Sequence, residues 1–316
     1  MRHLKLIPDD TKIPFVKWRH VAVTLSVIVV IASTVLLFTR GLNFGIDFTG
    51  GILIEVSTDG PADIAEFRSS LGGLGLGEIQ IQEFGQADDV LIRVQSPDDG
   101  DEAASQRVVD MIRAELGDRV VEYRRVEVVG PQVSGELVQD GILAVVIAVF
   151  LMLIYIWFRF EWQFAIGAIV SLIHDVMATI GIFCILQLEF NLASIAALLT
   201  IVGYSMNDTV IVYDRIRENL RKFKKMDLGE LIDLSINQTL SRTVMTSGTT
   251  LLALAALFIF GGAVLRDFTF AMIFGIFVGT YSSIFVGAPV LLAIGVSRDG
   301  TGNAEKDFKD RASGKA

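Results

Sequence analysis

Six apolar runs dominate the chain, and each is long enough to cross a bilayer as a helix. A helical span needs roughly 17–25 mostly apolar residues. The runs that reach this length cover residues 21–38, 141–158, 164–186, 192–212, 243–263 and 268–296. Pro289 lies near the end of the last run, where we expect it to bend the helix. The first run is long for a signal peptide and lacks a clear cleavage site, so we interpret it as a retained anchor.

Between the first and second runs the period of the pattern changes. Alternating, β-branched segments predict strands, and two amphipathic segments followed by glycine predict helices. The expected strands are residues 51–57, 78–84, 90–94 and 120–129, and the expected helices are 61–71 and 101–116. The order β-α-β-β-α-β is that of a ferredoxin-like α+β domain. The predicted fold is therefore a bundle of six transmembrane helices with a ferredoxin-like domain inserted at residues 40–140.

Composition is consistent with this division. The chain has 316 residues, of which 52% are hydrophobic and 20% charged, and its formal net charge is -9. Residues 41–140 hold 20 acidic and 7 basic residues, a net of -13, so the remainder has a net of +4. The acidic balance gives no basic footprint for nucleic acid. The single cysteine, Cys184, lies in an apolar run, which excludes a disulfide framework and indicates a buried small side chain.

Basic residues indicate the orientation. Lysines and arginines cluster in residues 1–19, in the loop 213–242 and in the tail 297–316, which an even number of spans places on one side. The positive-inside rule makes that side cytoplasmic. The inserted domain is then expected outside the cytoplasm, with both termini inside.

Ionisable residues inside the apolar runs are costly and mark functional positions. They are His174 and Asp175 in the third run, Asp208 in the fourth and Arg242 at the start of the fifth. At a rise of about 1.5 Å per residue, Asp208 and Arg242 lie within one or two helical turns of each other in depth, and His174 lies nearer the midplane.

Two interpretations of these residues stay open. An Asp near a mobile Arg suits a site that takes up and releases a proton, whereas a fixed Asp208–Arg242 pair would only hold two helices together. Because neighbouring helix residues point about 100° apart, His174 and Asp175 are not expected to form one pair. Each is expected to contact another helix or to serve a proton relay.

Small and polar residues add packing information. Thr200, Tyr204 and Asp208 follow one another at a spacing of four, with Gly203 and Asn207 beside them, so one face of the fourth span is polar. The sixth span has small residues at the same spacing, which lets another helix approach closely; they are Ala271, Gly275, Gly279, Ser283 and Gly287. The chain has no nucleophile–base constellation, phosphate loop or metal-ligand spacing, so we predict neither an enzyme nor a cofactor.

Several motifs resemble a known family. They are residues 45–51 (GIDFTGG) after the first span, 129–131 (VGP), the His-Asp pair, 202–209 (VGYSMNDT), 213–219 (YDRIREN) and 239–250 (TLSRTVMTSGTT). Together they resemble the SecF-type subunits of the bacterial SecD/SecF protein-export family, related to RND (resistance–nodulation–division) transporters. Ser134 stands where this family often has glycine. The resemblance covers the chain from the first span to the sixth.

The resemblance implies a subunit that works with SecD and assists the SecYEG channel and the SecA motor in the inner membrane, with YajC as a further partner. It implies that the proton gradient drives the movement of emerging polypeptide, and that Asp208 and Arg242 match charged positions of the proton path. Asn207, His174 and Asp175 are further candidates. The glycines at 45, 50 and 51 suit sharp turns in the linkers, through which helix movement would reach the inserted domain.

Two other functions compete with proton-driven export. A purely structural partner in a translocon would contain the same charged residues in static contacts. A half-size efflux transporter would need a much larger substrate-binding domain than one of about 100 residues, so this alternative is the weaker one.

Overall fold

The computed structural model describes residues 8, 11–77, 79–95, 102–262 and 265–296 and divides into two compact units. One unit comprises residues 43–145 and 189–195; the other contains the rest of the six long helices. Several segments named from the sequence lie outside the described residues. They are the basic residues before position 8, residue 78 of an expected strand, residue 101 of an expected helix, residue 263 and the tail 297–316.

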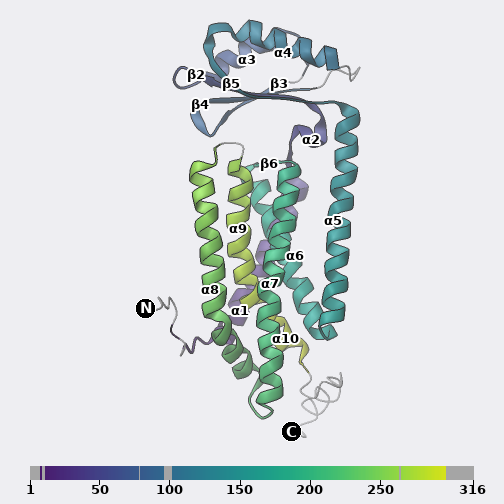
Figure 1. The fold of residues 1–316 in the computed structure, drawn as a ribbon, viewed down its shortest axis with the longest axis vertical. Coiled ribbons are helices and arrows are strands. Elements are labelled where there is room, and N and C mark those ends of the chain that lie inside the picture. Colours follow the sequence, from purple (N-terminus) through teal and green to yellow (C-terminus); the bar gives the residue numbers. More distant parts are fainter. Residues whose placement is uncertain (1–7, 9–10, 78, 96–101, 263–264, 297–316) are drawn as a thin grey trace. The chain divides into compact units, whose positions relative to one another are not determined.

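Six helices are long and apolar enough to cross a membrane, as the sequence predicts. A 3-10 turn, Phe15–Trp18, leads into the first. The helices are α1 (Arg19–Thr39), α5 (Pro131–Arg159), α6 (Trp162–Leu186), α7 (Leu192–Lys222), α8 (Leu228–Phe260) and a sixth built from α9 (Arg266–Ser282), a π-helical turn η4 (Ser283–Gly287) and α10 (Ala288–Ile294) (Figure 1). Of these helices, α6, α7 and the sixth are the most buried, and α5 and α8 the least.

The connection expected as a loop at 213–242 is largely helical, because both flanking helices extend into it. Helix α7 continues to Lys222, and α8 begins at Leu228, where the Asp227 carboxylate accepts a hydrogen bond from the Gly229 amide. Apolar residues at helical spacing explain the extension. Ile216 and Leu220 of α7 pack in one buried cluster with residues near the start of α8.

The sixth span is interrupted where the sequence indicated a bend. The π-helical turn η4 ends two residues before Pro289, which is the second residue of the final helical segment, α10. Proline tolerates the first turn of a helix because its missing amide hydrogen is not needed there.

The small-residue stripe of the sixth span packs against α7. A Cβ placed on Gly275 would lie 2.3 Å from Ile201 Cδ1, and one on Gly279 would lie 2.9 Å from Ser205 Cβ. Further along, a Cβ on Gly287 would meet the Tyr213 hydroxyl at 2.8 Å. The expected close approach is confirmed, and α7 is the helix that approaches.

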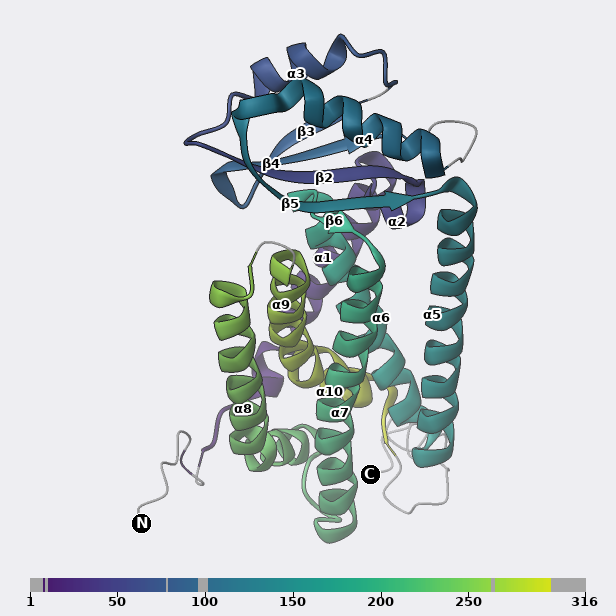
Figure 2. The same cartoon turned by 45° about the horizontal axis from the view of Figure 1, so that its top comes forward.

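The inserted unit has the predicted β-α-β-β-α-β order. Its elements are β2 (Gly51–Thr58), α3 (Ile64–Gly72), β3 (Ile79–Phe84), β4 (Gln86–Val94), α4 (Glu102–Leu116), a 3-10 turn (Gly117–Arg119) and β5 (Val120–Val129). The sheet order is β3-β4-β2-β5, and every neighbouring pair is antiparallel. Helices α3 and α4 lie on one face of this sheet (Figure 2). Helix α3 begins later than Pro61 because the Asp63 side chain accepts hydrogen bonds from the Ala65 and Glu66 amides.

The two faces of the sheet have different surroundings. Ile52, Ile54 and Val56 of β2 pack beneath the helices, whereas Leu53 packs with Ile46 on the other face. Glu55 lies on that second face and is only 2% exposed. Burial raises the pKa of the Glu55 carboxyl, and the positive charges of Arg124 and Arg125 offset this only in part.

Three short elements were missed from the sequence. They are β1 (Asn43–Phe44), α2 (Ile46–Thr49) and β6 (Glu189–Phe190), and β1 pairs with β6 in parallel. Gly50 and Gly51 have φ of 68° and 125°, as expected of sharp turns. Gly45 differs, because its φ of -74° is open to any residue. Close packing favours glycine there, since a Cβ would lie 2.6 Å from Glu189 Oε1.

Candidate functional site

Asp208 lies inside the bundle, held by hydroxyl groups of two other helices. Its side chain is 4% exposed. Thr243 of α8 donates a hydrogen bond to Oδ1 at 2.6 Å, and Ser283 of η4 donates to Oδ2 at 2.5 Å. Among the described residues, Asp208 makes no ion pair. The carboxyl group therefore connects three helices through neutral donors.

Among the described residues, Arg242 makes no hydrogen bond or ion pair with Asp208, although its positive charge is near enough to act on the carboxyl group through space. It precedes Thr243 on α8, and because successive helix residues point about 100° apart, Thr243 and not Arg242 bonds the carboxylate. Arg242 is exposed in this single chain, and so is Asn207, beside Asp208 on α7. The static Asp208–Arg242 pair weighed from the sequence is not formed within the described part of the chain.

His174 and Asp175 form a contact that the sequence argument excluded. His174 Nδ1 lies 2.9 Å from Asp175 Oδ1, and both residues are buried. Their Cβ atoms point in different directions, but the longer imidazole side chain reaches back across the helix surface. The expected contact to another helix is also present, since Asp175 Oδ2 accepts hydrogen bonds from Ser205 of α7 and from Ser282 of α9.

Hydroxyl groups therefore supply most of the site, and sequence reasoning undervalued them. The sequence pattern places Ser283 only in the packing stripe and indicates no role for Ser205 or Ser282. A further hydroxyl contact lies about one turn from Thr243 and Ser283 along the same spans, where Ser247 of α8 and Thr280 of α9 lie 2.9 Å apart. The sequence signal for these contacts is the adjacent pair Ser282 and Ser283 within an apolar span, where each polar side chain needs a hydrogen-bond partner.

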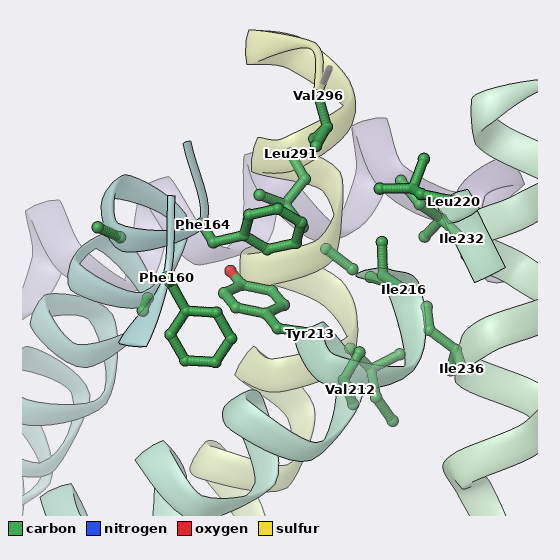
Figure 3. Close-up of a cluster of buried hydrophobic side chains, with 14 of the residues drawn as sticks. Phe160, Phe164, Val212, Tyr213, Ile216, Leu220, Ile232, Ile236, Leu291 and Val296 are labelled. Carbon is green, nitrogen blue, oxygen red and sulfur yellow. The ribbon is translucent and has the colours of Figure 1, made fainter. Parts of the chain in front are cut away.

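Apolar packing follows directly after Asp208 on α7. The Tyr213 ring makes edge-to-face contacts with Phe164 and Phe160, at centroid distances of 5.3 and 6.0 Å (Figure 3). Leu291 and Ile216 belong to the same cluster. The Tyr213 hydroxyl is buried and has no hydrogen-bond partner among the described residues. The Tyr213 cluster therefore contributes apolar packing five residues after Asp208 on the same helix.

A six-helix membrane bundle with intramembrane carboxyl groups and one inserted ferredoxin-like domain defines half of an RND-type membrane transport protein. The family model described as "Protein export membrane protein SecD/SecF, C-terminal" matches residues 109–297, and the "SecD/SecF GG Motif" matches residues 35–62. The chain belongs to the SecD/SecF family.

Similar proteins agree with this assignment. The protein translocase subunit SecF of Rhodobacter capsulatus is 44% identical, over 98% of this chain and 96% of that protein. SecF of Vibrio alginolyticus is also 44% identical, over 93% of this chain and 94% of its own length.

Solved structures of larger proteins share the fold. The crystal structure of SecDF from Thermus thermophilus, a translocon-associated membrane protein, superimposes with a TM-score of 0.82 at 36% identity and covers 91% of this chain. SecDF in a super-membrane-facing form gives a TM-score of 0.68 at 35% identity, over 97% of this chain. This chain covers 39% and 40% of those two chains. It is therefore a translocation-associated subunit whose fold corresponds to part of a SecDF chain.

Proposed function

We propose that this protein pairs with SecD and uses the proton gradient across the inner membrane to assist protein export through SecYEG and SecA. Its action is mechanical, with no cofactor. The observation that carries the proposal is Asp208, a buried carboxyl group within the bundle that is held by Thr243 and Ser283 and makes no ion pair among the described residues. Intramembrane carboxyl groups that face a bundle interior are typical of proton relays.

Arg242 has a separate part in this proposal. A charged side chain on the outer surface of a membrane bundle is costly unless it meets a partner or water. Arg242 is exposed in the single chain, so we place it at the face that receives SecD. A change in the proton occupancy of Asp208 then alters the contacts among three helices, and their movement reaches the inserted domain through its linkers.

The competing function is a static assembly subunit. The observation that favours it is the same set of bonds, because Thr243, Asp208 and Ser283 also connect α7, α8 and the sixth span structurally. The two functions differ in whether the carboxyl group must exchange a proton.

The test is export of a secreted reporter from cells that carry Asp208→Asn. Asparagine retains acceptor and donor atoms but cannot carry the exchanging proton, so we expect reduced export at full proton gradient and no difference from wild type once the gradient is collapsed. Asp214→Asn is the matched control. Asp214 lies on α7 like Asp208, but it forms an ion pair with Arg159, the last residue of α5. Normal export by Asp208→Asn in an assembled complex would favour the static subunit.

Orientation has its own test. We propose that both termini are cytoplasmic and the inserted domain is periplasmic. A reporter enzyme that works only outside the cytoplasm should be active when fused at Ala104 in α4. Activity of a cytoplasm-specific reporter at the same position would invert the topology.

A further inference from the structure

Two consecutive serines of the sixth span hold two different buried carboxyl groups. Ser282 donates to Asp175 Oδ2 of α6 at 2.7 Å, and Ser283 donates to Asp208 Oδ2 of α7 at 2.5 Å. Asp175 is fully buried. Because neighbouring helix positions point about 100° apart, one step along the chain turns from α6 to α7. The two carboxyl groups therefore belong to one hydroxyl-linked cluster.

Each serine has a second acceptor within its own helix. The Ser282 hydroxyl lies 3.1 Å from the Gly279 carbonyl oxygen, and the Ser283 hydroxyl lies 3.1 Å from that of Thr280. A hydroxyl group has one hydrogen to donate and two lone pairs that accept. With an ionised carboxylate the serine donates to it. With a protonated carboxyl group the serine accepts from it and turns its own hydrogen to the backbone carbonyl.

This arrangement serves both protonation states without moving heavy atoms. Helical serines commonly lie near a carbonyl oxygen one turn earlier, and both serines here have such an acceptor at the same distance, three residues back. The geometry therefore allows both carboxyl groups to gain and lose a proton.

The surroundings of Asp175 contain few other titratable groups. His174 lies on the same helix, with Nδ1 2.9 Å from Asp175 Oδ1. Helix α7 contributes Ser205 and, three residues further along, Asp208. Helix α9 contributes Tyr281, whose ring centroid is 5.9 Å from that of His174, and α1 contributes Ser26, which lies 3.2 Å from the Tyr281 hydroxyl.

A change of helix type coincides with the serine pair. The π-helical turn begins at Ser283, directly after Ser282. Such turns are rare and occur often at functional sites. In this one the Ser282 carbonyl oxygen also accepts a hydrogen bond from the Ser171 hydroxyl of α6, at 3.4 Å. The helix is thus irregular at the point where it meets both carboxyl groups.

We propose that Asp175 is a second proton-carrying carboxyl group, and that Ser282 and Ser283 couple its proton occupancy to that of Asp208. This inference rests on the proposed proton-driven function and adds a second site to it. The coupling needs no proton to pass along the serines. The state of one carboxyl group sets the hydroxyl orientation and the local charge that the other one meets.

The test is an infrared titration of the full chain, purified with its SecD-type partner in lipid nanodiscs. The C=O stretching band of protonated carboxyl groups is followed against pH, and the contribution of Asp175 is assigned by subtracting the spectrum of Asp175→Asn. We expect Asp208→Asn to move the Asp175 midpoint by about one pH unit, because the neighbouring charge is gone. In a Ser282→Ala/Ser283→Ala background, that displacement should fall to less than half.

Two further variants separate coupling from folding. Ser282→Thr/Ser283→Thr retains both hydroxyl groups and should restore the displacement. Thr239→Val removes a buried hydroxyl that bonds only backbone carbonyls of its own helix, and it should leave the titration unchanged. An Asp175 band that does not titrate, or that titrates identically with and without Asp208, overturns the inference. Either result for Asp175 would not change the effect of Asp208→Asn on export. The export assay therefore tests the proposed function independently of this inference.

Discussion

Arg93 in β4 pairs with Glu189 in β6, although 96 residues separate them in the chain. Arg93 Nη2 lies 2.5 Å from Glu189 Oε2, and Arg93 Nη1 donates to Asn43 Oδ1 at 3.1 Å. The Arg93 and Glu189 side chains are only 11% and 14% exposed. The segment between α6 and α7 is thereby attached to the sheet of the inserted unit.

Glu189→Ala should destabilise the inserted unit. It leaves the Arg93 guanidinium largely buried without its anion, which costs roughly 3 kcal/mol in comparable sites. The measurement is the unfolding free energy of the unit, followed by proteolysis of the purified chain in urea. Arg93→Met/Glu189→Leu should recover most of the loss, since replacing both partners removes the buried charge. An equal loss in the double variant would show that packing, and not charge, is responsible.

Glu55→Gln should stabilise the inserted unit at neutral pH and do so less in acid. The pKa of Glu55 is raised by burial, and its Oε2 has no hydrogen-bond partner among the described residues. For a raised pKa, the stability is fully present below the ordinary glutamate value and is lost as pH rises through the folded-state value. The advantage of glutamine therefore grows with pH across that window. Thermal midpoints of both proteins measured from acid to neutral pH check this, and a constant difference would contradict it.

Gly275→Ala should disturb the contact between α9 and α7. A Cβ at this position would lie within 2.8 Å of three side-chain atoms of Ile201. Overpacking of this kind costs about 1–3 kcal/mol, to be read from the thermal midpoint of the purified chain in detergent.

Two variants test the Gly275 explanation. Ile201→Ala in the Gly275→Ala background should recover part of the stability, because it empties the space that the new methyl group needs. Gly203→Ala is the matched control, since a Cβ on Gly203 meets no atom within 4 Å. Alanine favours a helix more than glycine does, so Gly203→Ala should be neutral or stabilising. If it is as harmful as Gly275→Ala, contact with Ile201 does not explain the loss.

Tyr213→Phe should be nearly neutral or slightly stabilising. The Tyr213 hydroxyl is buried and makes no hydrogen bond within the described residues, so its removal sacrifices no bond. Tyr213→Ala should cost about 3–5 kcal/mol, because it opens a cavity between Phe160 and Phe164. The same detergent unfolding assay applies, with Tyr155→Phe on the exposed surface of α5 as the control. A large loss in Tyr213→Phe would point to an ordered water on the hydroxyl.

The period of the sequence was sufficient to predict the main elements. Apolar runs of span length predicted the six helices, and alternation with β-branched residues predicted the order of β2, α3, β3, β4, α4 and β5. The stripe at Gly275, Gly279 and Gly287 predicted a close helix contact, because glycines four residues apart or a multiple of four share one helix face and let another helix approach. These patterns are local, so they can be read without knowing which segments meet.

Contacts between distant segments depended on the tertiary structure. Pairing of β1 with β6 and of Arg93 with Glu189 joins residues that no local pattern connects. Residue spacing predicts similar depths for Asp208 and Arg242, but rotation about the helix axis decides hydrogen bonding, and it brings Thr243 to Asp208 in place of Arg242.

The sequence by itself determined the six spans, the inserted ferredoxin-like domain and the candidate ionisable residues, since hydrophobic period and intramembrane charge are properties of a single segment. Only the tertiary structure decided the partners of those residues. Asp175 meets His174, Ser205 and Ser282, and Asp208 meets Thr243 and Ser283, because helix rotation and the π-helical turn at Ser283 fix which side chains face each other.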